Sequence, residues 1–192
     1  MEFIKNYIEK SIETKRNILE NEKIISKIRD VSLVIVESLK NGGKVLICGN
    51  GGSAADAQHI AAEFVNRFYY DRPGLAAMAL TVDTSILTAI ANDYGYEKIF
   101  SRQVQTCAKK GDVLIGISTS GSSKNVVNAI IEAKTKGVFT VGLTGEKEGT
   151  IFENADITIK IPSSETPIIQ ESHIMTSHII CAVVEKMIFR KN

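Results

Sequence analysis

Two side chains in the middle of the chain are spaced for metal chemistry. His59 and Glu63 are four residues apart in a segment, Ala54 to Glu63, whose composition predicts a helix. Residues at this spacing share one helix face, so an imidazole and a carboxylate meet there. Such a pair can hold a borderline metal such as zinc. A solvent-exposed pair without a metal is the commoner alternative.

A glycine-rich turn stands directly before this helix. Val45 to Cys48 is a short apolar run typical of a buried parallel strand, and Gly49-Asn50-Gly51-Gly52-Ser53 follows it. Ser53 is a suitable N-cap, so the helix is expected to begin after it. Bare amides and a helix N-terminus together favour an anion, usually phosphate. The turn lacks the Lys-Ser/Thr ending of a Walker A loop.

A second polar turn has the same position relative to its strand. Ser118-Thr119-Ser120-Gly121-Ser122-Ser123 follows the β-branched run Asp112 to Ser118 and precedes another predicted helix. Hydroxyls and amides at a helix N-terminus can surround a phosphate without a cation. One hydroxyl is enough to cap a helix, so five hydroxyls favour a phosphate site over simple capping. Ser53 could add a contact from the first turn.

The remaining candidates are weaker. His178 lies in a strongly apolar predicted helix, where it is either an interior residue or an acid–base group near neutral pH. Asn92 and Asp93 lie in a predicted break between helices, where they either bind sugar hydroxyls or form an ordinary turn.

The surrounding pattern predicts how these turns are positioned. Residues 2–40 read as two helices separated at Asn21, and strands are expected near 45–48, 76–80, 112–118, 138–143 and 156–161. Helices are expected over 84–91, 96–109, from the second turn to about 136, and over 166–189. Alternating strands and helices imply a parallel sheet covered on both faces, with ligands beyond the carboxyl ends of its strands.

Composition narrows the function classes. The net charge is +1 and there is no long basic run, so neither a nucleic-acid nor a membrane surface is expected. No signal peptide is evident, and the three cysteines are scattered in apolar settings, which favours free thiols in a reducing compartment. We therefore expect a cytoplasmic protein.

Four motifs together resemble sugar isomerase (SIS) domains and, within them, the phosphoheptose isomerase family. They are Cys-Gly-Asn-Gly-Gly-Ser at 48–53, Ala-Asn-Asp at 91–93, Gly-Ile-Ser-Thr-Ser-Gly-x-Ser at 116–123 and Ile-Gln-Glu-x-His at 169–173. The resemblance implies one SIS domain over 1–192, a flavodoxin-like three-layer α/β/α sandwich with a five-stranded parallel sheet. It further implies that residues 1–40 form a helical extension used in oligomerisation, and that the chain is a homotetramer with active sites at subunit interfaces.

The same resemblance implies a reaction and its residues. The reaction is conversion of D-sedoheptulose 7-phosphate to D-glycero-D-manno-heptose 7-phosphate through a cis-enediol, which feeds bacterial lipopolysaccharide or capsule. Glu63 would be the base and His178 the acid, beside one zinc ion per subunit. The implied zinc ligands are His59, Glu63, Gln170 and His178. The implied substrate contacts are Asn50, Gly51, Gly52, Ser53, Glu63, Asn92, Asp93, Ser118, Thr119, Ser120, Ser123 and Gln170.

The spacing of Gln170 and His178 raises a geometric question. Eight residues on one helix correspond to a rise of about 12 Å, which one metal ion can barely bridge. Either the last helix begins after Gln170, or the ligands come from two chains, and we favour two chains. An alternative function is that of a non-catalytic SIS relative that binds the replication initiator protein, and another is an isomerase of a different sugar phosphate. The presence of both Glu63 and His178 favours an enzyme.

Overall fold

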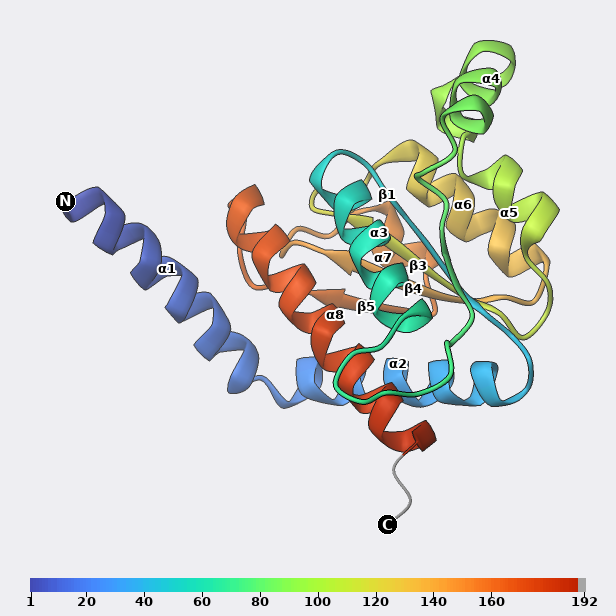
Figure 1. Cartoon of the computed structure of the whole chain (residues 1–192). Coiled ribbons are helices and arrows are strands. Elements are labelled where there is room, and N and C mark those ends of the chain that lie inside the picture. The colour runs from blue at the N-terminus through green and yellow to red at the C-terminus, as the bar shows by residue number, and fades with distance from the viewer. Residues whose placement is uncertain (190–192) are drawn as a thin grey trace.

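The computed structural model describes residues 1–189, and its centre is a five-stranded, all-parallel sheet (Figure 1). The last three residues of the predicted domain, 190–192, lie outside the described part. The strand order is β2-β1-β3-β4-β5. The strands are β1 (Val45–Gly49), β2 (Ala77–Ala79), β3 (Val113–Ser118), β4 (Phe139–Thr144) and β5 (Ile157–Lys160). The predicted five-stranded parallel sheet is confirmed.

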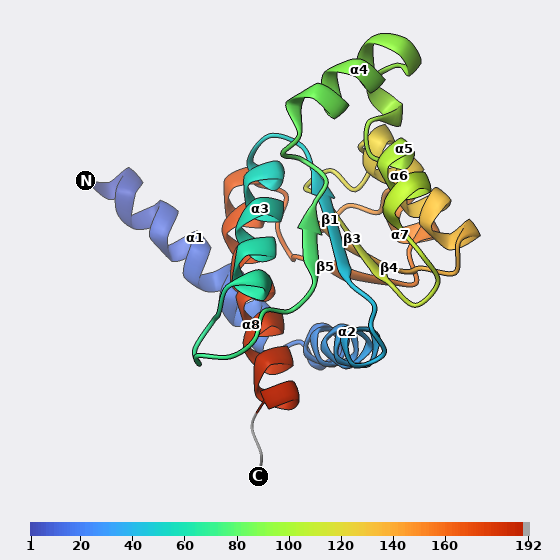
Figure 2. The ribbon, with the colours of Figure 1, turned by 45° about the vertical axis from the view of Figure 1, so that its right-hand side comes forward.

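Helices cover both faces of the sheet, as Figures 1 and 2 show. One face carries α2 (Glu22–Lys40), α3 (Gly52–Val65) and α8 (Thr166–Phe189). The other carries α5 (Ser101–Cys107), α6 (Lys124–Thr135) and α7 (Thr150–Asn154). Within residues 1–189, no helix combines the length and the apolar character needed to cross a membrane.

The alternating side chains of the strands build two separate cores. Val45 and Ile47 of β1 pack under α2, α3 and α8, whereas Leu46 and Cys48 pack under α5 and α6. All four side chains have no exposed surface. A strand buried on both faces needs apolar residues at every position, which explains the uninterrupted apolar runs in the sequence.

The two polar turns lie where the order of the strands reverses. In the order 2-1-3-4-5, the connections after β1 and β3 leave in opposite directions, which makes a crevice between them. Gly49 pairs in register with Ile117, so the two turns begin at the same level of the sheet. The expected position of both turns is therefore confirmed.

Two helices project from the body of the molecule. In Figures 1 and 2, α1 (Glu2–Leu19) extends away from the sheet, and α4 (Thr84–Tyr94) rises above it. No residue of α4 is buried, and in α1 only Thr14 and Ile18 are. Phe3 and Leu19 of α1 are 80% and 71% exposed. An amphipathic helix that leaves its apolar side chains in water within one chain is typical of a surface that another chain covers.

Several predicted boundaries were wrong. Helix α3 begins at Gly52, because Gly51 adopts φ +56° and starts the helix two residues early. Ser53 is therefore a buried residue of the first turn, not the N-cap. Helix α4 continues to Tyr94 and ends at Gly95, with φ +89°, so Asn92 and Asp93 are helical.

The segment predicted as one helix over 96–109 is two. A 3₁₀ turn, η1 (Tyr96–Lys98), is followed by the short α5. Between them the chain turns and buries Ile99 and Phe100 in the second core. Helix α5 stops early because the Asp112 carboxylate accepts the backbone N–H of Lys109 at 2.9 Å. Helix α7, in the polar region after β4, was not predicted.

Candidate active site

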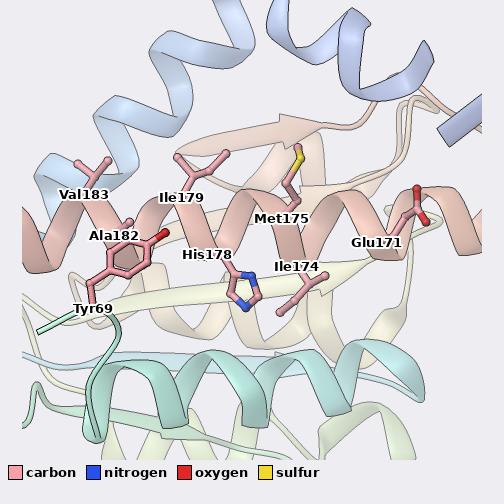
Figure 3. A pocket seen from close by; sticks show the side chains of 8 residues that line it. All are labelled: Tyr69, Glu171, Ile174, Met175, His178, Ile179, Ala182 and Val183. Carbon is pink, nitrogen blue, oxygen red and sulfur yellow. The ribbon is translucent and has the colours of Figure 1, made fainter. Parts of the chain in front are cut away.

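His59, Glu63 and His178 meet between α3 and α8. The Nε2 atom of His59 is 3.1 Å from Oε1 of Glu63 and 3.4 Å from Nε2 of His178. The imidazoles of His59 and His178 are T-shaped, with their centroids 4.9 Å apart. Figure 3 shows His178 leaving α8 towards α3, beside a surface pocket whose lining includes Tyr69 and Ile174. His178 thus joins His59 and Glu63, which lie more than a hundred residues earlier in the sequence, in one cluster that a ligand can reach.

The dimensions of this cluster fit a zinc ion. Ligand atoms placed tetrahedrally about 2.1 Å from zinc are about 3.4 Å from one another. The separations of 3.1 and 3.4 Å match this value, and the three donor atoms all lie within 4.8 Å of one another. Two imidazole nitrogens and one carboxylate oxygen are also the donor types that zinc accepts. Three protein donors leave a fourth position open, as in catalytic zinc sites.

Gln170 lies on α8, as His178 does, but it contacts a different part of α3. Because α8 begins at Thr166, the idea that a helix starts after Gln170 is wrong. The Gln170 amide lies directly over Gly52, where a Cβ atom would come within 2.4 Å of its Nε2. His178, about 12 Å further along α8, faces His59. The chain thus brings Gln170 to the glycine turn and His178 to His59 and Glu63.

The hydroxyls of the second turn converge on one another. Ser118 Oγ is 2.9 Å from Ser123 Oγ and 3.3 Å from Ser120 Oγ. Ser123 is the residue before α6, yet its side chain caps no helical N–H. The simple capping explanation therefore does not account for this hydroxyl. A cluster of hydroxyls at a helix N-terminus is suited to an oxyanion.

An amide pair that the sequence did not reveal joins the two turns. Asn50 and Asn125 exchange two hydrogen bonds of 2.8 Å between their side chains. Asn125 is 2% exposed, and its Oδ1 also accepts the backbone N–H of Val126 at 3.0 Å. The Tyr96 hydroxyl donates to Asn50 Oδ1 at 2.9 Å. An Asn just after the serine cluster was a weak signal for this contact, and nothing in the sequence indicated Tyr96.

Asn92 and Asp93 are not brought to the other candidates within this chain. Both are exposed on α4, where Asn92 Nδ2 donates to Asp93 Oδ1 at 2.8 Å. Among the hydrogen bonds of residues 1–189, none joins either side chain to a predicted site residue outside this pair. Their predicted contact with substrate therefore requires either the site of another subunit or movement of α4.

The third histidine of the motifs, His173, is interior. It has no exposed surface, and its Nε2 is 3.1 Å from the carbonyl oxygen of Thr144 at the end of β4. A carbonyl only accepts, so Nε2 carries the proton and donates. Burial lowers the pKa of His173 to about 4, and the bond to Thr144 only partly opposes this. A neutral, enclosed imidazole of this kind anchors α8 to the sheet.

Comparison with known proteins agrees with this architecture. The SIS domain family matches residues 6–145. Phosphoheptose isomerase of Aneurinibacillus thermoaerophilus is 57% identical over 98% of this chain and 96% of its own length. Phosphoheptose isomerase 2 of Campylobacter jejuni subsp. jejuni is 56% identical, covering 98% and 94%. The structure of phosphoheptose isomerase GmhA from Neisseria gonorrhoeae superimposes with a TM-score of 0.90 at 40% identity, covering 96% and 98%.

The parallel sheet, with a glycine turn and a serine turn at the ends of its strands, is thus the architecture of a sugar isomerase fold. The chain belongs to the SIS domain family and, within it, to the phosphoheptose isomerases. It is an enzyme of the aldose–ketose isomerase type.

Proposed function

We propose that this chain interconverts D-sedoheptulose 7-phosphate and D-glycero-D-manno-heptose 7-phosphate, with one zinc ion in each active site. The observation that carries the proposal is the cluster of His59, Glu63 and His178 at zinc-ligand spacing. Relatives that share more than half of their residues with this chain are named for the same reaction.

The reaction needs one proton moved between two carbons. Glu63 removes the proton from the hydroxyl-bearing carbon next to the carbonyl, and the electron pair forms the double bond of a cis-enediol. His178 donates a proton to the former carbonyl oxygen. Glu63 then returns its proton to the former carbonyl carbon while the other hydroxyl gives its proton back to His178 and becomes the new carbonyl, which yields the isomeric sugar. His59, Glu63 and His178, with or without Gln170, would hold the zinc. When bound, zinc polarises the carbonyl and orients the hydroxyls.

Glu63 has two assigned roles, as metal ligand and as base. Its Oε1 is the oxygen that faces His59. A carboxylate that binds a metal through one oxygen keeps the other free to accept a proton. Metal binding weakens such a base, because the cation stabilises its charged form. The assignment therefore predicts a base that is precisely placed but only moderately strong.

The phosphate would lie at the serine turn. Ser118, Ser120 and Ser123 supply converging hydroxyls, and the first turn adds the backbone of Gly51 and Gly52 with Ser53. Thr119 and Ser120 also line a small pocket together with Lys147, a cation from the loop after β4 that the sequence did not single out. The remaining predicted contacts, Asn50 and Gln170, border the same crevice.

Assembly would complete the site. We assign residues 1–192 to one SIS domain whose extension, 1–40, is used in a homotetramer, with α2 on the chain's own sheet and the exposed apolar side chains of α1 on other copies. The exposed apolar side chains of α1 and the unburied α4 support this assignment. In such an assembly α4 could carry Asn92 and Asp93, and α8 could carry Gln170, to the site of another subunit. A cytoplasmic location and a product used for lipopolysaccharide or capsule stay predictions.

The direct test replaces the base without changing its shape. Glu63→Gln cannot accept a proton, so kcat should fall about a hundred- to ten-thousand-fold. Exchange of substrate C–H with solvent deuterium should be lost as well. The control is Glu132→Gln on α6, a half-buried carboxylate that accepts a hydrogen bond from Gln105 and should behave as wild type when replaced. If Glu63→Gln turns over and washes in deuterium normally, another residue is the base, and Asp93 is the next to test.

Metal removal and a substrate panel separate the alternatives. Chelation should reduce turnover, and added zinc should restore it. Activity on a shorter sugar phosphate but not on sedoheptulose 7-phosphate would identify an isomerase of another substrate. Binding to the replication initiator protein without any turnover would indicate the regulatory relative instead.

A further inference from the structure

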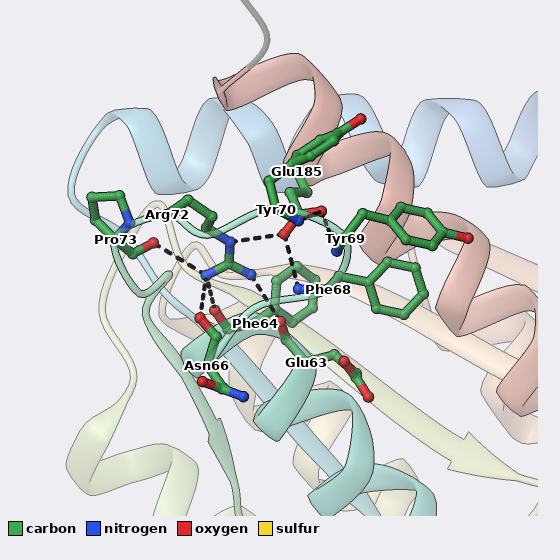
Figure 4. Close-up of polar contacts among 9 residues, drawn as sticks. All are labelled: Glu63, Phe64, Asn66, Phe68, Tyr69, Tyr70, Arg72, Pro73 and Glu185. Carbon is green, nitrogen blue, oxygen red and sulfur yellow. Dashed lines mark hydrogen bonds and ion pairs between the residues drawn. The ribbon is translucent and has the colours of Figure 1, made fainter.

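A buried arginine lies beneath the metal cluster. Arg72 belongs to the loop between α3 and β2, and its side chain is only 2% exposed. Its Nη2 donates to the carbonyl oxygen of Glu63 at 2.8 Å, and its Nη1 donates to that of Phe64 at 2.6 Å (Figure 4). These carbonyls belong to the last turn of α3, where a cation is favourable to the helix dipole. The guanidinium therefore holds the end of the helix that carries His59 and Glu63.

The partner of Arg72 comes from the other helix of the site. Glu185 of α8 has no exposed side-chain surface, and its Oε1 accepts from Arg72 Nε at 3.0 Å. The same carboxylate accepts the backbone N–H of Phe68 at 2.9 Å and of Tyr69 at 2.7 Å. Burial by itself would raise the pKa of Glu185, but these N–H groups and Arg72 lower it overall. Glu185 is thus a fully bonded anion that joins α8 to the loop after α3.

The network of Arg72 and Glu185 contacts both helices that supply the cluster, α3 and α8. Arg72 bonds to the backbone of Glu63 itself. Glu185 is seven residues after His178, so both lie on the same face of α8. It holds the backbone of Phe68, whose ring lies 5.5 Å from the His178 imidazole, centroid to centroid. The network therefore reaches Glu63 through a hydrogen bond to its backbone, and His178 through helix α8 and the ring contact of Phe68.

A buried ion pair is a poor means of stabilising a fold. Removing two charges from water offsets most of their attraction, and apolar residues of similar size often stabilise as well or better. What the pair does provide is a fixed geometry, because a planar guanidinium and a carboxylate can hydrogen-bond in only a few relative orientations. The direction of these bonds therefore matters more to the site than their contribution to the free energy of unfolding.

We propose that Arg72 and Glu185 are positioning residues that set the spacing of α3 and α8, and through it the metal affinity of His59, Glu63 and His178. The inference rests on the proposed metal site. Outer-shell groups that orient ligands change metal affinity by about 10- to 100-fold. We therefore expect Glu185→Gln, which keeps the size but removes the charge, to weaken metal binding by that factor. Arg72→Lys keeps the charge but loses the fork, and it should act in the same direction.

The matched control is a second ion pair with a buried carboxylate in the same protein. Asp112 has no exposed side-chain surface and pairs with Lys44 Nζ at 2.6 Å. It also accepts two backbone N–H groups, from Lys44 and Lys109, much as Glu185 does. This pair precedes β1 and β3, at the opposite ends of the strands from the two polar turns. Asp112→Asn should therefore lower the melting temperature as Glu185→Gln does, but leave metal affinity unchanged.

The experiment measures cobalt(II) and zinc affinity of the full-length apoproteins, by visible absorption and by competition with a chelator. Circular dichroism establishes that each variant is folded at the temperature used, and Arg72→Lys replaces Glu185→Gln if the latter is not. Weaker binding in every site variant that is folded, but not in Asp112→Asn, supports the inference. Unchanged affinity in folded Glu185→Gln or Arg72→Lys, or an equal loss in Asp112→Asn, overturns it. Wild-type protein that binds neither metal overturns the metal site itself and the inference with it.

Discussion

The buried imidazole of His173 should make the stability of this enzyme depend on pH in a defined window. Its folded-state pKa is about 4, against about 6.5 for an accessible histidine. Between these values the unfolded chain binds a proton that the folded protein does not. The free energy of unfolding should therefore fall as the pH drops from about 6.5 to 4, and this term should be constant above pH 7.

The size of the effect follows from the two pKa values. A tenfold difference in proton affinity corresponds to roughly 1.4 kcal/mol. His173 should therefore remove about 3 kcal/mol of stability by pH 4. That is a large share of the roughly 5–15 kcal/mol by which a domain is stable. The site is fully enclosed, so solvent does not screen the effect.

The perturbation is His173→Gln, which does not titrate but can still donate an amide N–H to Thr144. Urea unfolding is followed by circular dichroism at several values between pH 7 and pH 4, with EDTA present to exclude metal binding. Wild type should lose about 3 kcal/mol more than the variant across this range. Ser177→Ala, which removes a buried hydroxyl bonded to the His173 carbonyl, is the control and should keep the wild-type slope. Parallel curves for wild type and His173→Gln would refute the reasoning.

Three further predictions concern substrate binding and assembly. Ser120→Ala should raise KM several-fold with little change in kcat, because the hydroxyl binds ground and transition states alike; Ser122→Ala is the comparison, and equal KM values would remove Ser120 from the phosphate site. Asn125→Ala should also raise KM, since Asn50 loses both reciprocal bonds, at a stability cost of about 1–3 kcal/mol measurable by urea unfolding. Ile8→Glu, on the exposed stripe of α1, should break the assembly in sedimentation; an active wild-type monomer would contradict the tetramer.

The fold was predictable because its signals are local. The apolar runs at Val45–Cys48 and Val113–Ile117 could only be strands buried on both faces, and the helices between them imply parallel pairing. The ends of helices were less predictable. Gly51 starts α3 early through a positive φ, and Asp112 ends α5 through a side-chain bond to Lys109. Both effects depend on the conformation or position of one group in space, which the hydrophobic periodicity of the sequence does not reveal.

For the site, the sequence by itself determined one pair and two turns. The spacing of His59 and Glu63 places them on one helix face, and the glycine and serine turns follow directly from strands that must end at one edge of the sheet. Those conclusions need only the repeat of a helix and the direction of a strand. The apolar setting of His178 left it as either an interior residue or an acid–base group, and its role as a ligand, like that of Gln170, was indicated only by resemblance.

Only the tertiary structure decided which distant groups meet. It brought His178 to His59, Gln170 to Gly52, and Asn125 to Asn50. It also paired Arg72 with Glu185, 113 positions apart in the chain. The physical reason is that packing of α3 against α8 is set by the whole core beneath them, and side chains on two helices meet only after that packing is fixed.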